Sequence, residues 1–180
     1  MDAEDLSEAK VYVGTYRKYN EGSLQGQWLT LSDYMDKDDF FEACKDLHRD
    51  EHDPEFMFQD CEGIPEGLIG ECWISDVVFE LVHKANKIAH FDAFISFLHL
   101  SGYSLDDDDV DSLVQKFKDS FYGKFSNESA FARLLVEDGA FGQIEDSIKG
   151  YLDYERIAED LFLSDFYFDD ETFSVFNRNY

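Results

Sequence analysis

One short motif in the chain has residue types that could bind zinc. His48, Glu51 and His52 follow the pattern H-x-x-E-H, in which two histidines one helical turn apart hold the ion and the glutamate acts as a general base. Pro54 disfavours helix at Asp53, so we expect the helix to end before His52 can face His48. We interpret the motif as a solvated helix end and expect no catalytic, cofactor-binding or metal-binding residues. A metal-dependent hydrolase that uses these three side chains is kept as an alternative.

The acidic run 106–111 resembles a calcium-binding loop at first sight. Counted from Asp107, positions 1, 3 and 5 are acidic. Position 6 is Ser112, where the turn requires glycine, and position 12 is Lys118, where a bidentate glutamate is required. The run is better explained as the start of a helix, where carboxylates interact favourably with the helix dipole. The chain also lacks nucleophile-elbow, P-loop and dinucleotide-binding motifs, so we expect no enzyme.

The charge of the chain is its most unusual property. There are 41 Asp and Glu against 15 Lys and Arg, a formal net charge of −26. The excess is spread along the chain, with a net charge of −10 over residues 1–61, −4 over 62–103 and −12 over 104–180. A small domain needs a net charge of only about 2–8 in magnitude to stay in solution. The electric field of a net charge of −26 repels nucleic acid and anionic membranes and attracts basic proteins.

The apolar content shows that these acids belong to a folded chain. Hydrophobic residues make up 44% and aromatic residues 17%, which is too much for an acidic disordered tail. The odd number of cysteines, at positions 44, 61 and 72, gives no disulfide framework or zinc-knuckle spacing. Neither a signal peptide nor an apolar run of about 18 residues is present, so we expect a cytoplasmic protein.

Hydrophobic periodicity predicts an α+β protein. The charge density of the chain favours an elongated chain of three small domains. Residues 63–67 place a proline between two glycines and mark the first boundary. The predicted domains are an N-terminal α+β domain (1–62), a central helical domain (63–122) and a C-terminal α+β domain (123–180). The predicted strands are 10–16, 27–31, 55–59, 166–170 and 172–176. The predicted helices are 36–49, 76–88, 90–100, one from Asp107 or Asp108 to 121, 128–138, 143–152 and 154–163.

The amount of charge is compatible with mimicry of DNA. Duplex DNA carries about one charge per 1.7 Å of its axis, so 26 charges correspond to roughly 44 Å, or about 13 base pairs. A compact globule of this length has a diameter of about 41 Å, so DNA-like charge density requires an elongated molecule. Halophilic adaptation would also give an acidic surface.

Three stretches resemble the ArdA antirestriction family: VYVGTYRKYNEGSLQGQWLTL (11–31), DPEFMFQDCEGIPEGLIGE (53–71) and YLDYERIAEDL (151–161). The resemblance implies a protein of mobile genetic elements that binds type I restriction-modification enzymes in place of DNA. It also implies three small domains in a row and a homodimer formed through the C-terminal region, which together mimic a bent duplex. The implied partner is the methyltransferase core with its DNA-specificity subunit.

We therefore predict that distributed carboxylates form a partner-binding surface. An acidic chaperone or inhibitor of another basic DNA-binding protein is the alternative function. The acids expected to contribute most are Asp38, Asp39, Glu42, Asp46, Asp50, Glu51, Asp106, Asp107, Asp108, Asp109, Asp111, Glu155, Glu159 and Asp160.

Overall fold

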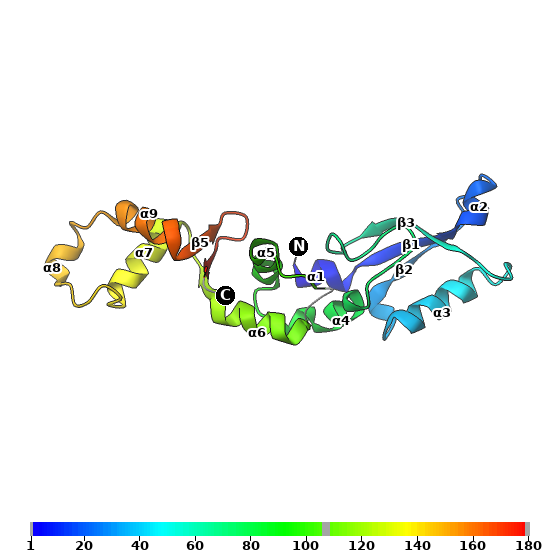
Figure 1. Cartoon of the computed structure of the whole chain (residues 1–180), viewed down its shortest axis with the longest axis horizontal. Helices are drawn as coiled ribbons and strands as arrows, with labels where there is room; N and C mark the ends of the chain where they lie inside the picture. Colours follow the sequence, from blue (N-terminus) through cyan, green and yellow to red (C-terminus); the bar gives the residue numbers. More distant parts are fainter. Residues whose placement is uncertain (1, 106–108, 179–180) are drawn as a thin grey trace. The chain divides into compact units, whose positions relative to one another are not determined.

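The computed structural model describes residues 2–105 and 109–178 (Figure 1). The chain forms two compact units. Unit 1 comprises Met1–Ile95 and Tyr103–Ser112, and unit 2 comprises Ser96–Gly102 and Leu113–Tyr180. Helices α5 (Phe91–Ser101) and α6 (Val110–Ser120) contribute residues to both units. Helices and small antiparallel sheets occur in both units, so the predicted α+β class is confirmed.

Unit 1 is built on a three-stranded antiparallel sheet with β1 in its centre. Strands β1 (Lys10–Thr15), β2 (Gln27–Thr30) and β3 (Phe56–Glu62) are arranged in the order β2-β1-β3. The three predicted strands are confirmed, and β3 continues beyond its predicted end at residue 59. The β1–β3 register shifts between Tyr12 and Val13.

Helix α3 (Lys37–Leu47) packs against the sheet of unit 1 and lies below it in Figure 1. Phe40 and Cys44 are fully buried, as the spacing predicts. The ring of Phe40 lies 5.9 Å from that of Phe58 on β3 and 5.7 Å from that of Phe79. The predicted cap is confirmed, because the Asp36 carboxylate accepts a hydrogen bond from the backbone N–H of Asp39.

Short helical elements complete unit 1. The predicted helix 76–88 is α4 (Asp76–Lys84), which Ser75 caps as predicted, followed by the 3-10 turn η2 (Ala85–Lys87). Helices α1 (Ala3–Ser7) and α2 (Tyr16–Asn20) and the 3-10 turn η1 (Leu31–Asp33) were not predicted. One turn is too short to show hydrophobic periodicity, and α1 and α2 each begin at a capping side chain instead.

Unit 2 contains a second three-stranded antiparallel sheet. Its strands β4 (Phe121–Lys124), β5 (Phe166–Asp169) and β6 (Ser174–Asn177) are arranged in the order β4-β6-β5. The predicted C-terminal hairpin is confirmed as β5–β6, but β6 is a central strand because β4 pairs with its other edge. Strand β4 was missed, since it has only four residues, contains Gly123 and directly follows α6.

Helices α7 (Glu128–Glu137) and α9 (Tyr154–Ser164) of unit 2 pack around an aromatic core. Between them, α8 (Asp146–Lys149) has no buried residue, and the predicted helix 143–152 shrinks to this single turn. Phe131 of α7 is fully buried, with its ring 4.8 Å from that of Phe166 and 5.0 Å from that of Phe125. Across residues 2–105 and 109–178, no helix is both long and apolar enough to cross a lipid bilayer.

The three cysteines are free thiols. Cys61 and Cys72 are exposed, whereas burial against the sheet of unit 1 raises the pKa of the Cys44 thiol to about 12. Cys44 therefore acts as a small apolar core residue.

Candidate acidic binding surface

The solvent side of α3 presents a closely spaced set of carboxylates. Burial of Phe40 and Cys44 fixes the rotation of the helix, and the acids at the remaining positions are exposed. Residues 38–46 cover about 12 Å of helix axis at 1.5 Å per residue. The spacing is therefore about one carboxylate per 4 Å, close to the 3.4 Å per charge along one DNA strand. We call this set the α3 acids: Asp38, Asp39, Glu42 and Asp46.

The charge of the α3 acids is largely uncompensated. In the part of the chain that the structure describes, none of the four forms an ion pair with a lysine or arginine. Asp39 additionally accepts the backbone N–H of Met35 at 3.0 Å, which fixes its side chain at the start of the helix.

The two acids that follow α3 differ in their exposure. The Asp50 carboxylate accepts a hydrogen bond from Lys18 Nζ at 2.9 Å, which lowers its pKa, and its side chain is 62% exposed. The Glu51 side chain is only 6% exposed, and its carboxylate accepts the Thr15 hydroxyl at 2.7 Å. Glu51 thus belongs to the interior of unit 1, and we leave it out of the candidate surface.

The geometry around His48 does not suit zinc. His48 is 1% exposed; its Nε2–H donates to the Val13 carbonyl at 3.2 Å, and its Nδ1 accepts from Lys18 Nζ at 3.0 Å. Helix α3 ends at Leu47, and His52 is exposed. Both ring nitrogens of His48 are therefore occupied, and the two histidines do not share a helical face, as the sequence predicts.

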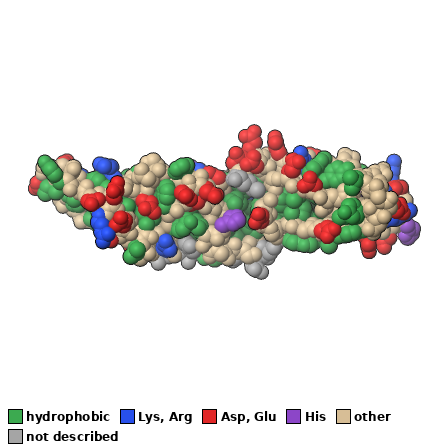
Figure 2. All heavy atoms as spheres, turned by 90° about the horizontal axis from the view of Figure 1, so that it is seen from above, with side chains coloured by type: hydrophobic (Ala, Val, Ile, Leu, Met, Phe, Trp, Pro, Cys, Tyr) green, Lys and Arg blue, Asp and Glu red, His purple; other side chains and the backbone are tan. Residues whose placement is uncertain are grey.

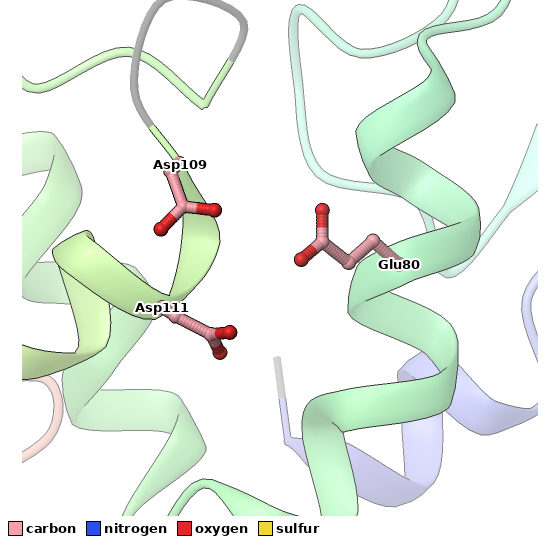
Figure 3. A group of neighbouring side chains, drawn as sticks. All are labelled: Glu80, Asp109 and Asp111. Carbon is pink, nitrogen blue, oxygen red and sulfur yellow. The ribbon is translucent and has the colours of Figure 1, made fainter.

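A second group of acids lies where α4 faces the start of α6 (Figure 3). Oxygen atoms of Glu80, Asp109 and Asp111 lie within 4.8 Å of one another. Lys84 Nζ lies 2.7 Å from Glu80 Oε1 and 2.7 Å from Asp111 Oδ1, and these hydrogen bonds, chiefly that with Asp111, raise the pKa of Lys84. The group is thus partly neutralised by an internal cation.

The Asp109 carboxylate caps α6, because it accepts the backbone N–H of Ser112 at 2.9 Å. This agrees with the interpretation of the acidic run as a helix start. Both Asp109 and Asp111 are exposed. The other predicted site residues of this run, Asp106, Asp107 and Asp108, lie outside the described residues.

The predicted acids of α9 are exposed but share a cation. Arg156 NH1 lies 2.7 Å from Glu159 Oε2, and Arg156 NH2 lies 3.8 Å from Asp160 Oδ1. Glu155 is exposed on the same helix. The α9 acids therefore carry less net negative charge than the α3 acids.

The two units carry unequal shares of the charge. Unit 1 has 27 acids and 8 bases, a net charge of −19, whereas unit 2 has 14 acids and 7 bases, a net charge of −7. The sequence segments did not reveal this difference, because the acidic run 106–111 follows unit 2 residues in the sequence but belongs to unit 1. The strongest negative field is therefore expected around unit 1.

Sequence reasoning missed the residues that compensate or accompany these acids. Lys18 carried no recognisable signal, because its partners lie on other elements; for Lys84 the i,i+4 spacing to Glu80 was a signal, but the pairing with Asp111 of α6 was not. It also missed a cavity on the open face of the unit 1 sheet, beside Tyr12 and Trp28. The alternation of Lys10, Tyr12 and Gly14 with buried valines was the available signal for that face.

An exposed acidic surface on an α+β scaffold attracts basic proteins. The antirestriction protein family ArdA matches residues 11–175 of the 180-residue chain. The chain therefore belongs to the ArdA antirestriction family. A search of the curated proteins gave no match. Family membership implies that the protein acts on restriction-modification enzymes.

Proposed function

We propose that this protein inhibits type I restriction-modification enzymes by occupying the groove that holds DNA in their methyltransferase core. The observation that carries the proposal is the largely uncompensated row of α3 acids, which averages about one carboxylate per 4 Å of helix axis. Carboxylates accept charge-assisted hydrogen bonds from arginine and lysine as phosphates do. A basic groove built for DNA would therefore accept this surface.

The net charge supports the same function. At −26 the chain is repelled by nucleic acid and anionic lipid and is steered toward basic surfaces. The contributing carboxylates are the α3 acids with Asp50, the acidic run 106–111 with Asp109 and Asp111, and the α9 acids Glu155, Glu159 and Asp160. Each exposed charge contributes a small, screened amount, so the surface acts collectively.

We also propose a homodimer that forms through the C-terminal region, and three small domains (1–62, 63–122 and 123–180) arranged to follow a bent duplex. Support for the dimer comes from large apolar side chains that unit 2 exposes. Tyr151 is 90% exposed and Leu163 is 84% exposed. Aromatic side chains are enriched at protein–protein interfaces. The others in unit 2 are Tyr122, Phe141, Ile148 and Phe173.

The experiment is a pull-down with the tagged full chain from an extract of cells that contain a type I system. Recovery of the methyltransferase and specificity subunits, with loss of the complex as salt rises, supports the proposal. Recovery of other basic proteins without these subunits would instead support an acidic chaperone. A complex that is insensitive to salt would contradict phosphate mimicry.

A further inference from the structure

The face of the unit 1 sheet that α3 leaves uncovered holds an open cavity of about 490 Å³. In Figure 1 this face lies above the strands, and Figure 2, seen from above, shows hydrophobic side chains at the surface there. The volume falls within the range of about 300–1,000 Å³ that is usual for ligand sites. We call it the sheet pocket; its lining residues are Tyr12, Tyr19, Leu24, Trp28, Met57, Gln59 and Asp60.

The strand register brings two aromatic rings and a carboxylate side by side. Tyr12 of β1 is paired with Trp28 of β2 on one side and with Asp60 of β3 on the other. The neighbouring Val11 and Val13 are fully buried, so Tyr12 points to the opposite, open face. The pocket floor therefore rests on three hydrogen-bonded strands.

The aromatic walls are held in place before any ligand arrives. The rings of Tyr12 and Trp28 meet edge to face at 5.5 Å and 71°. The Tyr12 hydroxyl donates to the Leu24 carbonyl at 2.9 Å, which fixes the loop between β1 and β2 against the ring. Tyr19 remains 49% exposed at the rim. A preorganised pocket of this kind loses little side-chain entropy on binding.

The electrostatics of the pocket favour a cation. Faces of tryptophan and tyrosine rings attract cations. Lys10, which does not line the pocket, already places its Nζ 4.9 Å from the centroid of the Trp28 ring. Glu62 pairs with Lys10 at 2.8 Å and offsets its charge. Asp60 is exposed at the pocket, and within residues 2–105 and 109–178 no lysine or arginine forms an ion pair with it.

We propose that the sheet pocket receives an arginine side chain of the partner protein. A guanidinium is planar, stacks on aromatic rings and binds a carboxylate through two parallel hydrogen bonds, whereas a lysine ammonium does neither. The apolar lining from Leu24 and Met57 suits the aliphatic part of the same side chain. The identity of the partner rests on the proposed function, but the preference of the pocket for guanidinium does not.

The test is an NMR titration of the full chain, read at the indole N–H of Trp28. The chain has two tryptophans, so Trp73→Phe assigns the signal. The probe is N-acetyl-arginine methylamide, and the control is its neutral citrulline isostere. We expect a saturable shift of the Trp28 signal at roughly 1–50 mM arginine probe, the range for one cation–π contact plus one ion pair. Equal binding of citrulline, or no saturable shift, would overturn the proposal.

Two exposed acids provide a matched pair of variants. Asp60→Asn removes the carboxylate at the pocket, and Asp46→Asn removes a charge on α3 that is also exposed. We expect Asp60→Asn to weaken arginine binding about fivefold or more, and Asp46→Asn to change it less than about twofold. Equal effects would show that only the overall field attracts the probe. Tyr19→Ala at the exposed rim gives a second loss-of-binding variant that leaves the core untouched.

Binding to a purified methyltransferase core extends the test to the partner. There Asp60→Asn should reduce affinity more than Asp46→Asn does. The arginine titration shows whether the sheet pocket binds guanidinium, and its result does not depend on whether the wild-type chain binds that core. Failure of the proposed function is therefore distinguishable from failure of the pocket.

Discussion

The two units of the chain have similar cores and very different surfaces. Each packs helices and a three-stranded antiparallel sheet around buried phenylalanines, such as Phe40 in unit 1 and Phe131 in unit 2. Unit 1 carries a net charge of −19 and unit 2 a net charge of −7. Six of the ten large hydrophobic side chains found exposed among the described residues belong to unit 2, although it is the smaller unit.

This difference shows that the acid excess is not a requirement of the fold. Repulsion among like charges destabilises a compact state. A net charge of −19 on unit 1 would therefore lower its stability with no benefit unless the charge served binding. We infer that unit 1 provides most of the surface that binds the proposed basic partner. Unit 2 provides the contact of the proposed dimer. The following variants separate these two roles, beginning with the largest expected effect.

The largest effect is expected from the double variant Tyr151→Gln and Leu163→Gln in unit 2. Burying one large apolar side chain contributes about 1.5–3 kcal/mol, so the dimer should weaken by about 100-fold or more. Sedimentation equilibrium measures this directly. Met35→Gln, at a 79% exposed position of unit 1, is the control and should leave the dimer unchanged. Equal dissociation in the control would remove the distinction between the units.

The next effect is expected when all four α3 acids are neutralised together by Asp→Asn and Glu→Gln. Exposed ion pairs contribute about 0.5 kcal/mol each, so affinity for a methyltransferase core should fall by roughly 30-fold at low salt. The salt dependence of binding should also become shallower, while the dimer mass stays the same. Titration calorimetry at two ionic strengths measures the affinity and its salt dependence. An unchanged affinity would place the binding surface elsewhere.

A smaller effect is expected at the cap of α3. Asp36→Ala removes the hydrogen bond to the N–H of Asp39 and should lower the free energy of unfolding by about 1 kcal/mol. Asp36→Asn keeps a capping side chain but loses the same charge, so only its partner binding should change. Urea unfolding of both variants separates the effect of the cap on the stability of α3 from the effect of the lost charge. Equal loss of stability in the two variants would contradict a stabilising role of the Asp36 cap.

The smallest effect is expected from a single neutralisation. Asp46→Asn should reduce affinity for the methyltransferase core by about twofold, because one exposed charge among many is screened. It should leave thermal unfolding unchanged, since the Asp46 side chain is exposed. Complete loss of binding from this one change would contradict a collective surface.

Side-chain periodicity was sufficient to predict the larger elements of the chain. The spacing of Phe40 and Cys44 gave the orientation of α3, and Asp36 and Ser75 gave two helix starts. Helices α1 and α2 were missed because five residues carry no readable helical period, and β4 was missed because it contains Gly123 and directly follows α6. The boundary between the two units divides both α5 and α6, and its position is a property of tertiary contacts that no local pattern encodes.

The candidate surface was predictable only in part. Exposure of the α3 acids follows from the helix pattern, but the buried place of Glu51 depends on Thr15 and Lys18 from a different part of the sequence. The sheet pocket depends on the strand register that joins Tyr12, Trp28 and Asp60. No local pattern encodes such contacts, because each partner lies on a different strand.

The central claim is that the protein and DNA compete for one site on the restriction enzyme. Fluorescence anisotropy of a labelled duplex bound to a type I methyltransferase core, titrated with the full chain, tests it most directly. Competition predicts that the duplex is released completely, and that the apparent affinity of the protein falls in proportion as the duplex concentration rises. A ternary complex, in which the protein binds while the anisotropy of the duplex stays high, would contradict the account.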